Sequence, residues 1–123
     1  MKKLLLTTVL MTTILWATAS NAQSKRVIAG PENAPVTIEE YVDFLCSYCK
    51  SGSQTIERIL KAYPEQVNLV LRNMPLPHHN PLATTSAKAF YAAFLQSPTL
   101  AYQFQKELFK KQSQLLSSGE PLL

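Results

Sequence analysis

The two cysteines of the chain, Cys46 and Cys49, are separated by two residues. A thiolate is both a nucleophile and a metal ligand, so this pair could exchange disulfides or bind a metal ion. In disulfide exchange one cysteine attacks a substrate sulfur, and the other resolves the mixed disulfide that results. A disulfide between them would close only a very short loop and would stabilise a fold little. We therefore interpret the pair as reactive rather than structural.

The segments on either side of the pair predict where it lies. Residues 36–44 have the β-branched and aromatic composition of a strand, and residues 47–63 carry apolar residues at helical spacing. The free N–H groups and the positive dipole end of a helix stabilise an anion such as a thiolate. Cys46 is nearest to the helix end, so we predict that it is the nucleophile. Cys49, one turn into the helix, is then the resolving cysteine.

Pro64 ends this helix, and the apolar run that begins at Val67 predicts a second strand over residues 67–74. Strand, helix and strand in this order form a βαβ unit with parallel strands. Asn-Pro at residues 80–81 and Ser-Pro at residues 97–98 are typical helix starts. We expect one helix after each of them, the second running through Leu115. The predicted fold class is therefore α/β.

The first strand carries three acidic residues, Glu39, Glu40 and Asp43, and we expect at most one of them to be buried. Side-chain alternation places Glu40 on the same face as Val42, and Glu39 and Asp43 on the opposite face. We therefore choose Glu40 as the buried acid. Burial beneath the helix would raise its pKa, and it could then exchange protons with Cys49. An exposed or ion-paired carboxylate is the alternative.

Two adjacent histidines, His78 and His79, follow the second strand and are the only other soft metal ligands. A structural zinc site needs four ligands, and adjacent histidines seldom bind the same ion. A metal-binding Cys-x-x-Cys module is therefore the weaker alternative. The two histidines follow a strand end, where a functional site could lie, but we favour their interpretation as part of a polar loop.

The N-terminus has the pattern of a secretory signal peptide over residues 1–22. Two lysines at residues 2–3 precede an apolar run at residues 4–17, and small residues favour cleavage after Ala22. The apolar run is shorter than the roughly 20 residues of a transmembrane helix. Cleavage would lower the net charge from +4 to +2, which is too small to indicate a nucleic-acid partner. Residues 23–35, polar with glycine and proline, predict a lead-in loop.

Several segments together resemble the DsbA-like branch of the thioredoxin superfamily. They are Asn33-Ala34-Pro35-Val36-Thr37-Ile38, Asp43-Phe44, Cys46-Ser47-Tyr48-Cys49-Lys50, Leu69-Val70-Leu71-Arg72, Pro75-Leu76-Pro77, the strand that holds Glu40, and the alanine-rich helix. The resemblance runs from about Glu32 to Gln112. It implies a thioredoxin-like domain over residues 36–123, with a DsbA-type helical insert that begins at about residues 82–98.

The resemblance also implies a secreted or periplasmic thiol–disulfide oxidoreductase that acts on cysteines of exported proteins. It makes Cys46 the nucleophile, Cys49 the resolving cysteine and Glu40 the buried acid. The dipeptide Ser47-Tyr48 would tune the redox potential, and Ser47 stands where the family more often has proline. The dithiol is itself the redox group, so no metal or organic cofactor is expected. A membrane redox partner that recharges the pair is a second candidate partner.

One part of the family pattern has no counterpart here. After its helical insert the family has a loop with a cis-proline that faces the cysteines, then two strands and a closing helix. We can assign no residue of this chain to that loop, and we expect a partial, C-terminally truncated thioredoxin-like domain. The strand that holds Glu40 would then have an unpaired edge, which favours aggregation or domain swapping. A catalytically incompetent fragment is therefore the alternative to an active enzyme.

Overall fold

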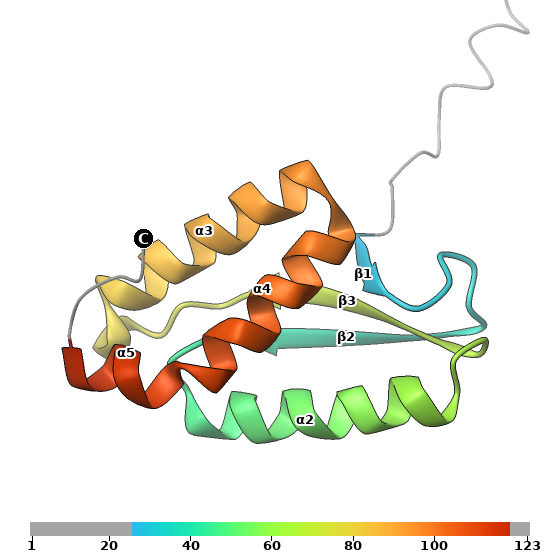
Figure 1. Cartoon of the computed structure of the whole chain (residues 1–123), viewed down its shortest axis with the longest axis horizontal. Coiled ribbons are helices and arrows are strands. Elements are labelled where there is room, and N and C mark those ends of the chain that lie inside the picture. Colours follow the sequence, from blue (N-terminus) through green and yellow to red (C-terminus); the bar gives the residue numbers. More distant parts are fainter. Residues whose placement is uncertain (1–25, 119–123) are drawn as a thin grey trace, which may run out of the picture.

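The computed structural model describes residues 26–118 of the 123-residue chain. The predicted signal peptide at residues 1–22 lies outside the described residues. The described part is a three-stranded mixed sheet with helices packed against it (Figure 1). The α/β fold class predicted from the sequence is therefore confirmed.

Two parallel strands and the helix between them form the centre of the fold. β2 (Val36–Val42) pairs in parallel with β3 (Val67–Asn73) along its full length, and α2 (Ser47–Ala62) connects the two. This is the predicted βαβ unit. β3 is the middle strand and is buried from Val67 to Leu71. β2 has no strand partner on its other side among residues 26–118, and its residues are mostly exposed or partly exposed.

A short strand precedes this unit in the segment that we predicted to be a lead-in loop, residues 23–35. β1 (Val27–Ala29) pairs antiparallel with β3, which gives the strand order β1-β3-β2. Three residues are too few to show the alternation that identifies a strand in a sequence. Gly30 then turns the chain with φ +80°, and a Cβ at this position would collide with the backbone of Val67 and Asn68. Only glycine fits this turn without displacing the middle strand.

Three helices follow β3, after a single 3-10 turn at Pro77–His79. They are α3 (Leu82–Gln96), α4 (Pro98–Lys110) and α5 (Gln112–Ser118). The predicted single helix through Leu115 is therefore divided. Lys111 takes up a turn conformation, φ −90° and ψ 7°, and α5 begins near the start of α2, where Gln112 binds the carbonyl of Cys46 (Figure 1). None of the helices within residues 26–118 combines the length and the apolar character needed to cross a bilayer.

The apolar core reaches the segment that precedes the cysteines. Phe44 is 1% exposed, and its ring centroid lies 5.6 Å from those of Phe90 in α3 and Phe109 in α4. Aromatic pairs at this separation and tilt attract each other in addition to the area that they bury. The turn at residues 43–46, called the reactive turn below because it ends at Cys46, is therefore anchored to both helices.

Candidate active site

Cys46 and Cys49 lie where β2 gives way to α2. Cys46 is the N-cap residue of α2, in extended conformation with φ −81° and ψ 122°, and Cys49 lies in the first turn. The carbonyl of Cys46 accepts a hydrogen bond from the N–H of Lys50 at 3.1 Å. Both cysteines are free thiols and partly exposed. The Cys46 side chain makes no capping hydrogen bond, and the first turn carries no acidic residue. The N–H groups at this helix start can therefore stabilise a thiolate.

The dipeptide between the cysteines faces solvent. Ser47 and Tyr48 are both exposed, and Tyr48 is 87% exposed. Tyr48 therefore presents its aromatic ring to solvent next to Cys46.

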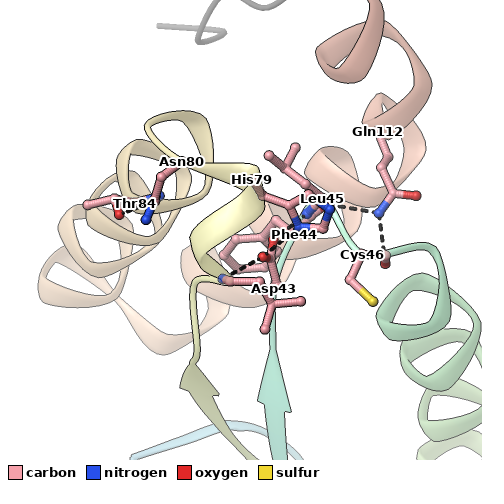
Figure 2. A network of polar contacts seen from close by, with 9 residues as sticks. Asp43, Phe44, Leu45, Cys46, His79, Asn80, Thr84 and Gln112 are labelled. Carbon is pink, nitrogen blue, oxygen red and sulfur yellow. Dashed lines mark hydrogen bonds and ion pairs between the residues drawn. The ribbon is translucent and has the colours of Figure 1, made fainter.

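Asp43 fixes the turn that leads into Cys46 (Figure 2). It is 2% exposed. Its carboxylate accepts hydrogen bonds from the backbone N–H of Leu45 at 2.7 Å and of Leu76 at 2.8 Å, and Nδ1 of His79 lies 2.8 Å from Oδ2. The backbone carbonyl of Asp43 accepts from the N–H of Cys46 at 3.1 Å. One buried carboxylate therefore joins the reactive turn to the loop after β3.

This arrangement corrects two expectations from the sequence. We placed Asp43 on the exposed face, but β2 ends at Val42, so side-chain alternation does not extend to Asp43. We also placed His78 and His79 together in a polar loop, whereas only His78 is exposed and His79 pairs with Asp43. One signal was available in the sequence. Parallel strands bring the segments after their carboxyl ends to the same edge of a sheet, and these residues follow two such strands.

A glutamine from the last described helix supports the same turn from α5. Gln112 is 4% exposed, and its Nε2 donates to the carbonyls of Phe44 at 2.9 Å and Cys46 at 3.0 Å (Figure 2). The Cys46 carbonyl therefore accepts from both Gln112 and the helix backbone. The sequence did not single out Gln112, because one glutamine in a helix forms no recognisable pattern.

Glu40 lies partly buried on β2 against the second turn of α2, so the prediction that it is the buried acid of this segment was wrong: that acid is Asp43. A Cβ added at Gly52 would be 3.7 Å from its Oε1. The amide of Gln105 in α4, which is 0% exposed, donates to Glu40 Oε2 at 3.4 Å and to Ser53 Oγ at 2.8 Å. Burial raises the pKa of Glu40 to about 7, and the hydrogen bond from Gln105 opposes part of that rise. A carboxyl with this pKa can take up and release a proton near neutral pH.

The surroundings of Cys49 favour its protonated form. Burial raises the pKa of the Cys49 thiol, and a hydrogen bond with the backbone of Asp43 works against this rise. The neighbouring Cys46 and the charge of the Asp43 carboxylate raise the pKa of Cys49 further. The surroundings of the two cysteines therefore differ: Cys46 is the N-cap residue of α2, whereas the surroundings of Cys49 favour its protonated thiol.

The described residues contain no group of three or more His, Cys, Asp or Glu side chains placed to hold a metal ion. His79 is engaged with Asp43, and His78 packs its ring 4.1 Å from that of His79.

The chain was compared with family models and with solved structures. The family model Thioredoxin_4, described as thioredoxin, matches residues 22–120. The crystal structure of DsbA2 from Pseudomonas aeruginosa superimposes with a TM-score of 0.64 at 27% sequence identity. That match covers 74% of this chain and 50% of the DsbA2 chain.

Curated relatives are all sodium/proton antiporters, matched over a small part of their length. The chain is 30% identical over 80 residues to NhaA of Herminiimonas arsenicoxydans and 39% identical over 66 residues to NhaA 3 of Salinispora tropica. These matches cover 65% and 54% of this chain but only 13% and 10% of the antiporters. The chain thus spans about an eighth or less of these two relatives.

Glu40 should make the free energy of unfolding depend on pH. The ordinary pKa of a glutamate side chain is 4.5, and that of Glu40 in the fold is about 7, so between these values the folded state binds more protons than the unfolded state. Stability from Glu40 is therefore fully present below pH 4.5 and is lost as the pH rises to about 7. In urea titrations, the unfolding free energy of the wild type minus that of Glu40→Gln should fall across this window and stay level on either side.

Glu39→Gln is the matched control for this prediction. Glu39 is exposed on the same strand and pairs with Arg72 of β3. The control variant should keep the wild-type loss of stability between pH 4.5 and 7. A Glu40→Gln variant that keeps it as well would show that Glu40 does not titrate in this range.

Gln112 should contribute more to stability than its exposed neighbour Gln114 on the same helix. Gln112→Leu removes the side-chain donor from the carbonyls of Phe44 and Cys46. A buried acceptor that loses its donor costs about 1–3 kcal/mol, whereas Gln114→Leu should change stability by less than about 0.5 kcal/mol. Denaturant midpoints of the two variants give the comparison. Equal midpoints would mean that the Gln112 amide does not support the turn.

Proposed function

Because this chain belongs to the thioredoxin family and has a DsbA-like fold, we propose that it is a thiol–disulfide oxidoreductase that acts on exported proteins through Cys46 and Cys49. The observation that carries the proposal is the position of Cys46 as the N-cap of α2, with Cys49 in the first turn. A thiol at that position is activated by the helix start, and the second thiol is near enough to resolve a mixed disulfide.

The exchange proceeds in two steps that conserve electrons. The Cys46 thiolate attacks one sulfur of a substrate disulfide, so that a Cys46–substrate disulfide forms and the other substrate sulfur leaves as a thiolate. Cys49 then loses its proton and attacks the Cys46 sulfur. The Cys46–Cys49 disulfide closes and the second substrate thiolate departs. Two electrons have passed from the protein dithiol to the substrate, and the reverse sequence oxidises a substrate dithiol.

Glu40 fits the proton transfer that the second step requires. Cys49 is held as a thiol by burial, so it must give up a proton before it attacks. Glu40 has a pKa of about 7 and lies against the turn of α2 that follows Cys49, where it can accept that proton through a water molecule. The amide of Gln105 holds the Glu40 carboxyl toward α2, because it binds Glu40 and Ser53 together.

The surroundings of the site support a polypeptide substrate. Tyr48 presents an exposed ring beside Cys46, and no acidic side chain occupies the first turn of α2. The N-terminal signal pattern favours export, and exported proteins meet an environment in which disulfides form. We propose exported cysteine-containing proteins as substrates and a membrane redox protein as the partner that recharges the pair. The dithiol serves as the redox group without a metal or an organic cofactor.

The two cysteines should give opposite phenotypes when they are replaced. Cys46→Ala should abolish exchange with oxidised glutathione, because the attacking thiolate is lost. Cys49→Ala should accumulate a glutathione adduct on Cys46, because the resolving thiol is lost. Mass spectrometry of acid-quenched reactions measures both outcomes. Ser51→Ala, at an exposed position on α2, is the matched control and should behave as the wild type. Wild-type exchange by Cys46→Ala, or no adduct on Cys49→Ala, would refute the assignment.

A further inference from the structure

Asp43 and His79 are titratable side chains beside the cysteines, and the exchange steps above do not use them. The Asp43 side chain is 1% exposed and that of His79 is 19% exposed. They come from segments that follow two different strands, β2 and β3. Their contact, with Nδ1 of His79 2.8 Å from Asp43 Oδ2, lies at the edge of the sheet where the reactive turn begins (Figure 2).

A buried carboxylate is stable only when its oxygens receive hydrogen bonds or an opposite charge. Two of the three donors to Asp43 are backbone N–H groups, those of Leu45 and Leu76. The third, His79, is the only side chain among the donors to Asp43 within residues 26–118. Because an ionised carboxylate is acceptor-only, His79 must carry its proton on Nδ1 to donate, as a neutral tautomer or as imidazolium.

The backbone of Asp43 in turn contacts both cysteines. Its carbonyl accepts from the N–H of Cys46 at 3.1 Å, and its backbone hydrogen-bonds with the Cys49 thiol. The charge of its carboxylate acts against the thiolate of Cys49. A change in the position of this carboxylate, or in the hydrogen bonds that offset its charge, therefore changes the surroundings of both cysteines.

We propose that Asp43 and His79 form a positioning pair that sets the thiolate reactivity, and thereby the redox equilibrium, of the Cys46–Cys49 dithiol. His79 compensates the Asp43 charge and holds the Asp43 backbone in place under the reactive turn. Without His79 the charge of the Asp43 carboxylate destabilises a thiolate in the reduced form more strongly. The disulfide carries no charge and is not destabilised in this way. Loss of His79 therefore favours the disulfide. The redox part of this inference rests on the proposed function, and the positioning part does not.

The test compares His79→Ala with His78→Ala in the full chain. His78 is an exposed neighbour of the same chemical type, whereas the hydrogen bond to Asp43 comes from His79. Equilibration in buffers of reduced and oxidised glutathione gives the equilibrium constant of the dithiol. His79→Ala should shift this constant toward the disulfide by about threefold or more, and His78→Ala should leave it unchanged. His79→Asn should restore the wild-type value, because its amide nitrogen can donate from the position of Nδ1.

Two results would overturn the proposal: a constant for His79→Ala that equals that of His78→Ala, or a His79→Asn variant that matches His79→Ala. If His79→Ala fails to melt cooperatively, His79→Gln replaces it, because its donor lies one carbon further out. Equal constants for the asparagine and glutamine variants would then refute the pair.

Alkylation of Cys46 by iodoacetamide, measured in a Cys49→Ala background, separates the positioning role of His79 from the proposed oxidoreductase function. The rate of alkylation should fall with His79→Ala whether or not the wild type forms an internal disulfide. An unchanged rate contradicts the positioning role.

Discussion

The reactive turn of this protein depends on one buried carboxylate that must be supplied with hydrogen-bond donors. Asp43 receives them from Leu45 within the turn and from Leu76 and His79 in the loop after β3. These bonds hold together two segments that the sheet places at the same edge, and the Asp43 carbonyl then binds the N–H of Cys46. Cys46 can cap α2 with open N–H groups because the residues just before it are fixed in this way.

The helical segment after residue 80 takes part in the site as well as in the core. Gln112 of α5 binds the carbonyls that flank the reactive turn, and Gln105 of α4 binds Glu40 beneath α2. The rings of Phe90 in α3 and Phe109 in α4 fix the ring of Phe44. Two amides and two aromatic rings thus connect the helices to the turn that carries Cys46 and to Glu40. The helices therefore supply contacts around the cysteine pair that the three short strands do not.

Local patterns in the sequence predicted most of the helices and strands. The contacts that the sequence did not predict join residues far apart in the chain. The βαβ unit and the position of the cysteine pair at the strand–helix junction follow from the spacing of residues within short segments. β1 was missed because three residues show no period, and Asp43 was misplaced because β2 ends one residue earlier. The bonds of His79, Gln105 and Gln112 join residues that are far apart in the chain. No local pattern encodes such a partner, so only the assembled fold reveals it.

The central claim is that Cys46 and Cys49 act as one reversible redox unit. The most direct test incubates the reduced full chain with glutathione buffers of increasing oxidised fraction, quenches with acid, alkylates the free thiols and weighs the products. We predict a single transition between the dithiol and the internal disulfide, with glutathione adducts present only in minor amounts. Two thiols that oxidise independently, or a glutathione adduct that persists on Cys46 while Cys49 stays reduced, would contradict the account.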